Sequence, residues 1–134
     1  MRIMVDTNIL ISAAVFNSRY LEKMLSFICL KHQLVLSSYI LDEFTRVVKE
    51  KFPTKQMNVA LFFGKFSFEI ENTPLHLPAH NLFEIRDMKD EPILYSAITA
   101  DVDVLISNDN DLLVVDISRP QIVSAHSFMD TYCS

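Results

Sequence analysis

The stretch that decides the fold is Met-Arg-Ile-Met-Val-Asp-Thr-Asn (residues 1–8), a short apolar run that ends at an acid. Its apolar residues, 3–5, predict a strand covered on both faces, because buried parallel strands are continuously apolar. Asp6 then falls at the carboxyl end of that strand. Ligands of open α/β sheets bind at this edge. We therefore interpret Asp6 as the first of several carboxylates that gather there to hold a divalent metal ion.

Strands and helices alternate along the rest of the chain. Apolar residues at helical spacing predict helices over residues 7–15, 18–32, 39–51 and 55–65, a helix that opens at Asp90, and a last one from Ala125. Short apolar runs predict strands at residues 34–36, 104–106 and 122–123, with a weaker one near 68–70. Thr7 or Asn8 is the expected cap of the first helix, and Gly64, the chain's single glycine, is expected to close the fourth. This alternation predicts an α/β fold with a mainly parallel sheet.

The composition favours one folded domain over residues 1–134. Half of the residues are hydrophobic and 22% are charged, which is typical of a chain with a real core and not of a disordered one. The net charge of −5 argues against a non-specific, strongly basic nucleic-acid binder. Two distant cysteines exclude a zinc site built from cysteine pairs and indicate a reduced, cytoplasmic protein. We expect no secretion signal and no membrane span.

Three further acids are expected at the same edge of the sheet as Asp6. Asp109 follows the strand at 104–106, and Asp90 opens a helix that leads back to that strand. The helix at 39–51 offers two acids. A helical wheel places Glu43 beside the apolar arc and turns Asp42 toward water, so Glu43 is the acid that can lean over the edge.

Each acid taken alone also has a purely structural interpretation. Asp6 and Asp90 are good helix caps, and a cap is as good an explanation of Asp90 as a metal ligand. Asp109 and Asp111 are common turn residues, and Glu43 on a helix flank is most often solvated. It is the four acids on one edge that shift the balance toward a functional site.

Four converging carboxylates would repel one another and raise their own pKa values. A hard divalent cation removes that cost, and oxygen ligands are those that Mg²⁺ and Mn²⁺ take. The chemistry that fits such a site is metal-assisted attack of water on a phosphodiester.

The order of these residues resembles the PIN domain family. The resemblance rests on Val-Asp-Thr-Asn at 5–8, on Ser37 followed by Ile-Leu-Asp-Glu-Phe at 40–44, and on Asp-Met-Lys-Asp at 87–90 with Ala97. It ends with Ala-Asp at 100–101 and Leu-Ile-Ser-Asn-Asp-Asn-Asp-Leu at 105–112. Each piece is weak by itself, but the four occur in order over nearly the whole chain.

The resemblance implies a three-layer α/β/α sandwich around about five strands and a ribonuclease that depends on Mg²⁺ or Mn²⁺. By motif, the catalytic and metal-binding residues would be Asp6, Glu43, Asp90 and Asp109. The supporting residues, which would orient ligands or water, would be Thr7, Asn8, Ser107 and Asp111. Small members resemble VapC-like toxins of toxin–antitoxin pairs, so RNA as substrate, an antitoxin partner and a homodimer or higher homo-oligomer are expected.

Two other features are interpreted more plainly. His76 and His80 have a metal spacing only on a helix, and Pro74 and Pro78 argue against a helix there. The basic residues after Glu43 form either a solvated face or, as the less favoured alternative, a track for an RNA backbone. The segment 68–85 matches no family motif.

Rival interpretations make definite demands that the sequence does not meet. A phosphoryl-transfer enzyme of the haloacid-dehalogenase kind needs a second Asp two residues after the first, where this chain has Asn8. A response-regulator receiver needs a lysine after a late strand, and none follows Lys89. A PIN-like module that binds RNA or protein without cutting is the remaining alternative; it would have no need to keep four acids.

Overall fold

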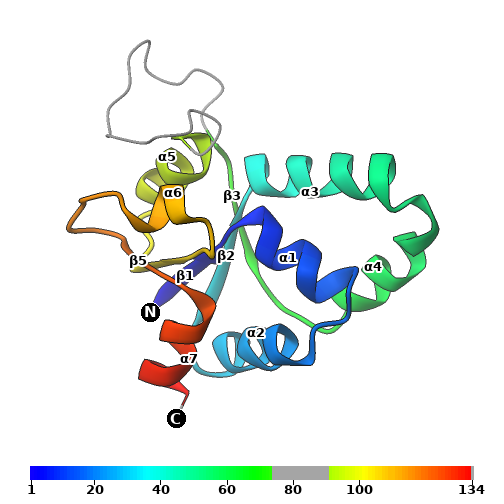
Figure 1. Cartoon of the computed structure of the whole chain (residues 1–134), viewed down its shortest axis with the longest axis horizontal. Coiled ribbons are helices and arrows are strands. Elements are labelled where there is room, and N and C mark those ends of the chain that lie inside the picture. Colours follow the sequence, from blue (N-terminus) through cyan, green and yellow to red (C-terminus); the bar gives the residue numbers. More distant parts are fainter. Residues whose placement is uncertain (74–90, 134) are drawn as a thin grey trace.

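A parallel sheet organises the chain in the computed structural model, which describes residues 1–73 and 91–133 (Figure 1). Within these residues the sheet has five strands in the order β3-β2-β1-β4-β5, and every neighbouring pair is parallel. The strands are β1 (Arg2–Val5), β2 (Gln33–Ser37), β3 (Glu69–Glu71), β4 (Val104–Ile106) and β5 (Gln121–Val123). The predicted α/β fold with a parallel sheet is therefore confirmed.

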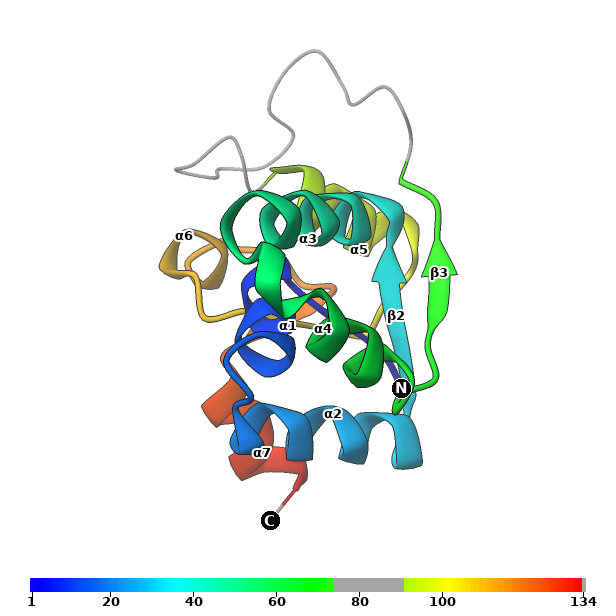
Figure 2. The same ribbon diagram turned by 90° about the vertical axis from the view of Figure 1, so that its right-hand side faces the viewer.

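Helices connect the strands and cover the sheet on both sides. They are α1 (Thr7–Ala14), α2 (Arg19–Lys31), α3 (Ser38–Lys51), a 3₁₀ turn (Pro53–Lys55), α4 (Gln56–Phe63), α5 (Glu91–Thr99), α6 (Asn110–Leu113) and α7 (Ala125–Tyr132). Figures 1 and 2 together show α1 and α4 on one side of the sheet and α5 on the other. None of the described helices is long and apolar enough to cross a membrane.

The central place of β1 explains why its sequence is continuously apolar. Ile3, Met4 and Val5 are fully buried, since β2 and β4 flank the strand and helices cover it. Each such side chain stabilises the fold by roughly 1.5–3 kcal/mol relative to an exposed one. The same position puts the carboxyl end of β1, and with it Asp6, in the middle of the sheet's edge.

Several local details differ from the sequence-based expectation. The cap of α1 is Asp6, not Thr7 or Asn8. Gly64 does close α4, but with a right-handed φ of −67°, so the helix does not end in the left-handed turn that glycine often supplies. Ile70 lies on the edge strand β3 and is 57% exposed, so its strand is held by backbone pairing more than by burial.

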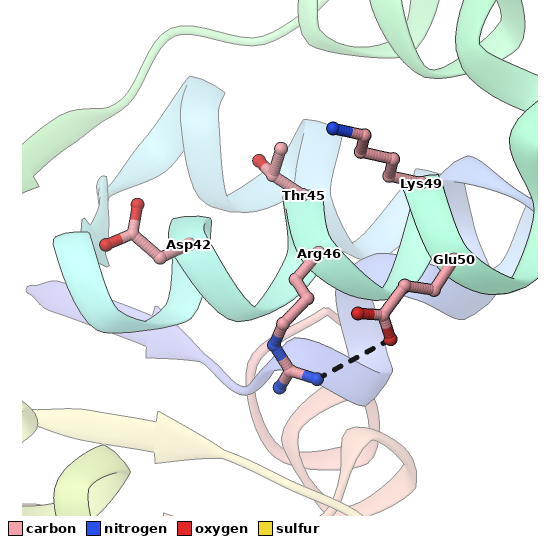
Figure 3. Close-up of a pocket in the computed structure, with 5 residues that line it drawn as sticks. All are labelled: Asp42, Thr45, Arg46, Lys49 and Glu50. Atoms are coloured by element: carbon pink, nitrogen blue, oxygen red, sulfur yellow. Dashed lines mark ion pairs between the residues drawn. The ribbon is translucent and has the colours of Figure 1, made fainter.

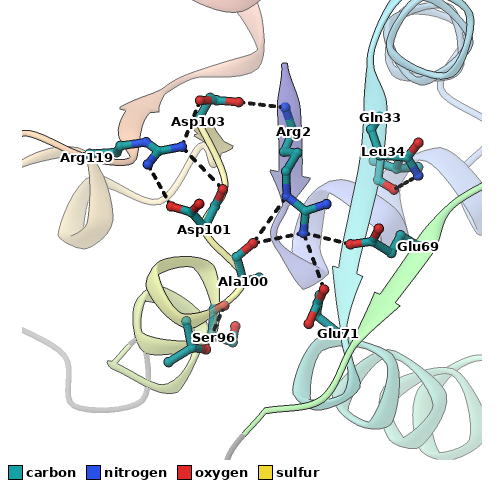
Figure 4. Close-up of polar contacts among 11 residues, drawn as sticks. Arg2, Gln33, Leu34, Glu69, Glu71, Ser96, Ala100, Asp101, Asp103 and Arg119 are labelled. Carbon is teal, nitrogen blue, oxygen red and sulfur yellow. Dashed lines mark hydrogen bonds and ion pairs between the residues drawn. The ribbon is translucent and has the colours of Figure 1, made fainter.

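Arg2, at the amino end of β1, joins this strand to β3 and to the segment that precedes β4 (Figure 4). Its guanidinium donates to the carbonyl oxygen of Ala100 at 2.9 Å and contacts Glu69 at 2.7 Å and Glu71 at 3.4 Å. Its backbone N–H donates to Asp103 at 2.8 Å. Hydrogen bonds to Arg2 lower the pKa of both Glu69 and Asp103 from their ordinary values. This cluster ties the edge strand β3 to the start of β1.

Replacing Arg2 with methionine should lower the free energy of unfolding by about 1 kcal/mol, because the Ala100 carbonyl loses a charged donor while solvent screens the ion pairs. Only the part contributed by Glu69 depends on pH: it is present above pH 4.5, the ordinary pKa of Glu69, and is lost as pH falls through the lowered pKa, while the hydrogen bond to Ala100 remains. Urea unfolding at several pH values measures both effects. Arg46→Met is the control, since the Arg46–Glu50 pair spans 3.9 Å between exposed side chains and should contribute little.

Candidate active site

Asp6 is a buried carboxylate at the centre of the sheet's carboxyl edge. The residue is only 3% exposed to solvent. One oxygen, Oδ1, accepts the backbone N–H of Ile9 at 3.0 Å and so caps α1. The other, Oδ2, accepts a hydrogen bond from the Ser107 hydroxyl. Asp6 is thus held rigidly from two strands at once, β1 through its own backbone and β4 through Ser107.

Ser107 also connects Asp6 to the acids that follow β4. Its Oγ accepts the backbone N–H of Asp109 at 3.0 Å, and Asp109 Oδ1 accepts the backbone N–H of Asp111 at 2.9 Å to cap α6. The chain of hydrogen bonds therefore runs from Asp6 through Ser107 to Asp109. The expectation that Asp6 and Asp109 lie on the same edge agrees with this geometry.

Glu43 reaches the same edge from α3. The helix begins where β2 ends, with Ser37 as its cap, and buries Ile40, Phe44 and Val48. Glu43 is half-buried beside this apolar face while Asp42 is exposed, as the helical wheel predicts.

The charges around Asp6 make its ionised form costly. Burial raises the pKa of Asp6 above its ordinary value of 3.8, while the hydrogen bonds from Ser107 and Ile9 lower it. The negative charges of Asp109 and Glu43 raise it further. Asp109 and Glu43 are therefore close enough to Asp6 to act on it electrostatically, and a bound cation would relieve the repulsion among the three.

Parts of the predicted site stay predictions. Asp90, like His76 and His80, lies outside the described residues. Among residues 1–73 and 91–133 no group of three His, Cys, Asp or Glu side chains lies close enough to hold a metal ion. The described acids approach one another without forming a complete set of ligands.

Thr7 supplies an observation that the sequence alone did not reveal. Its side chain is 3% exposed, and within the described residues its Oγ1 is buried with no hydrogen-bond partner. Buried hydroxyls are nearly always paired, with protein, water or a ligand. An oxygen atom left free beside Asp6 suits a hard cation or a water bound to one. Asn8, the next residue, is exposed.

An open cleft of about 590 Å³ lies along α3, on the outward side of the helix that carries Glu43 (Figure 3). It is lined by Asp42, Thr45, Arg46, Lys49 and Glu50. Two acids and two bases leave this surface without net charge. For Arg46 and Lys49, that balance favours the solvated-face interpretation over a track for an RNA backbone, which needs uncompensated cations; Lys51, Lys55 and Lys65 lie outside the cleft.

The sequence does not predict a role for two residues near the site. Ser38 and Thr73 hydrogen-bond to each other's segments at the start of α3. Ser38 directly follows β2, and Thr73 lies two residues after β3. A hydroxyl residue just after a strand is the sequence pattern that could have identified each as a helix-capping candidate. Their pairing could not be read from the sequence, because it joins residues that lie 35 positions apart.

Replacing Asp6 with asparagine should leave the metal-free protein at least as stable as the wild type at neutral pH. Asparagine keeps the cap on α1 and removes a buried charge, whereas Asp6→Ala loses the cap and about 1 kcal/mol. Because the native pKa of Asp6 is raised, the wild type should lose stability relative to Asp6→Asn as pH rises above 3.8 and through the raised pKa. Thermal unfolding with EDTA at several pH values tests this. A clear loss of stability in Asp6→Asn at pH 7 would contradict it.

The sequence was compared with models of protein families, and the fold with solved structures. The sequence model of the PIN domain family matches residues 2–111 of this chain. Two solved structures share the fold. One is VapBC2 from Rickettsia felis bound to a DNA fragment from its promoter, with a TM-score of 0.66, 18% identity, and coverage of 92% of this chain and 97% of that one. The other is PAE2754 from Pyrobaculum aerophilum, with a TM-score of 0.59, 14% identity, and coverage of 98% and 88%.

No curated protein sequence matches the chain. At such low identities the two structures support the fold alone. The family match, however, spans most of the sequence and includes the segments that carry Asp6, Glu43 and Asp109. The chain therefore belongs to the PIN domain family, whose members are generally nucleases.

Proposed function

We propose that this chain is a metal-dependent endoribonuclease that hydrolyses RNA phosphodiester bonds. The observation that carries the proposal is the buried Asp6 carboxylate, which stands at the carboxyl edge within electrostatic reach of Asp109 and Glu43. A fold gains nothing in stability from gathering like charges at a buried position. Such an arrangement is typical of a site that binds a cation and acts on a charged substrate.

Mg²⁺ or Mn²⁺ is the proposed cofactor. Carboxylate and hydroxyl oxygens suit these ions, and Thr7 Oγ1, which has no hydrogen-bond partner among the described residues, is an oxygen that a metal-bound water would satisfy. Asp6, Glu43, Asp109 and, from outside the described residues, Asp90 would hold the ion. When bound, the ion supplies a more acidic water and stabilises charge on the phosphate.

The chain's own residues prepare the site in three ways. The N–H of Ile9 and the hydroxyl of Ser107 fix both oxygens of Asp6, so the carboxylate needs no rearrangement when it binds. The Ser107 hydroxyl oxygen also accepts the backbone N–H of Asp109 and so holds that residue in place. The surrounding apolar core keeps bulk water away from Asp6, which strengthens electrostatic interactions there.

The non-catalytic alternative, a PIN-like module that binds RNA or protein, explains these features less well. A binding surface is best built from exposed groups. Asp6 is buried, and burial together with the nearby charges of Asp109 and Glu43 raises its pKa, so its charge is costly to the fold. A module without chemistry would be more stable with a neutral residue at this position.

RNA cleavage by the purified chain tests the proposal. With Mn²⁺ or Mg²⁺ the wild type should cut single-stranded RNA, and EDTA should stop it. Glu43→Gln should lower the rate by at least about a hundredfold, the order of loss when one preorganised catalytic group is removed. Asp42→Asn is the matched control, since it changes a neighbouring acid on the same helix that points to water. Equal rates for Glu43→Gln and wild type would place the activity elsewhere or in a contaminant.

The chain is further proposed to be the toxin of a toxin–antitoxin pair, silenced by a partner protein. The resemblance to VapC-like toxins and the shared fold with a chain of VapBC2 support this role. So does the surface of α4, which lies in the foreground of Figure 2 between α3 and α2. Met57 and Leu61 on this helix are 71% and 63% exposed. A helix whose residues are mostly apolar is normally buried on most of its surface, so a partner protein would complete the burial of α4.

A small open reading frame beside the gene, whose product co-purifies with this chain, is the expected finding. Leu61→Glu should weaken binding of that product at least tenfold, because a carboxylate would enter the apolar contact. Leu30→Glu is the control, since Leu30 is 78% exposed on α2 and lies off the α4 surface. Isothermal titration measures both variants. An isolated gene, or equal binding by Leu61→Glu, would count against the role.

A further inference from the structure

The start of α3 is held by a residue from a distant part of the chain. The backbone N–H of Tyr39 donates to Thr73 Oγ1 at 3.2 Å, and the backbone N–H of Thr73 donates to Ser38 Oγ at 2.8 Å. Each segment therefore gives one donor and one acceptor to the other. We call this reciprocal pair, Ser38 and Thr73 with their two amides, the α3 clasp.

The clasp does more than cap the helix. The first four N–H groups of a helix have no partner within it, and nearby side chains usually satisfy them. Ser37 does so locally for α3, by accepting the N–H of Ile40 at 3.2 Å. Tyr39 is instead satisfied from Thr73, two residues beyond β3. Because β2 and β3 pair in parallel with Ser37 opposite Glu71, the clasp joins the carboxyl ends of both strands to the helix.

Glu43 depends on how α3 is rotated about its axis. The residue lies about 6 Å along the helix from Tyr39, and a side chain at the helix surface moves by about 1 Å for a 10° rotation. Metal ligands tolerate only about 0.2 Å. Ile40, Phe44 and Val48 hold the helix against the core, but apolar contacts are not directional. The two hydrogen bonds of the clasp are directional, and they act one turn from Glu43.

We propose that Ser38 and Thr73 are positioning residues that fix the rotation of α3 and so aim the Glu43 carboxylate at the edge beside Asp6. The inference rests on the proposed function for the use of Glu43, and on the hydrogen bonds alone for the hold on α3. Neither side chain acts on the substrate; both act through the helix.

Thr73→Val removes the acceptor for Tyr39 and keeps the side-chain shape. In this variant Mn²⁺ should bind about tenfold more weakly by isothermal titration, as is usual when a group that orients a ligand is lost. The kcat for RNA cleavage should fall by a similar factor while KM stays the same, and Ser38→Ala should behave alike. Thr73→Ser restores the hydroxyl and should restore both quantities.

Ser124→Ala is the matched control. It removes the same kind of hydroxyl cap, which accepts the N–H of Ser127 at 3.1 Å, from α7, a helix that carries none of the proposed metal-binding acids. It should leave Mn²⁺ affinity and kcat within twofold of wild type. Equal Mn²⁺ affinity in Thr73→Val and wild type overturns the positioning role, as does a Thr73→Ser variant that stays impaired.

Failure of the proposed function looks different. A wild-type chain that neither binds Mn²⁺ nor cuts RNA overturns the nuclease, and hydrogen exchange of the amides at 39–43 then decides on the clasp. Faster exchange in Thr73→Val than in wild type, with α7 unchanged, supports the hold on α3. Identical exchange overturns it.

Discussion

The structure depends on one negative charge placed at the end of its central strand. Asp6 sits where β1 leaves the core, and an isolated carboxylate there would be very costly. Two hydrogen bonds offset part of that cost, one from the first turn of α1 and one from Ser107 beyond β4. The same bonds fix where α1 begins and how the ends of β1 and β4 meet. The central strand, its following helix and the acidic edge are thus set by a single side chain.

The other strands also end near a side-chain oxygen that accepts a backbone N–H, but there the oxygen belongs to a neutral hydroxyl. Each described strand ends in, or is soon followed by, a residue whose side-chain oxygen accepts a backbone N–H: Asp6, Ser37, Thr73, Ser107 and Ser124. For Asp6, capping and ligand binding are therefore not alternatives. A carboxylate has about four lone-pair positions, and the two hydrogen bonds that Asp6 accepts leave room for a cation. The cap orients the carboxylate that the proposed chemistry needs.

The fold followed from the sequence where burial is a local pattern. The apolar run of β1 and the helical spacing around Phe44 indicated both the elements and the choice of Glu43 over Asp42. The details that the sequence did not predict depend on contacts between residues that are distant along the chain. The hydroxyl of Thr73 meets Tyr39 only because β3 pairs with β2 in one register, and no periodicity encodes that register. The exposure of Ile70 likewise follows from the edge position of β3, not from its alternating sequence.

Charge balance constrains how such a site could recognise RNA. The whole chain carries −5, and the outward surface of α3 balances Arg46 and Lys49 with Asp42 and Glu50. A phosphate backbone finds no excess of cations there to draw it in. The attraction would have to come from the ion held among the acids, since a divalent cation is the largest local charge in such a site. Binding of substrate and binding of metal would then be coupled, because the metal-free edge repels the phosphate that the metal-loaded edge attracts.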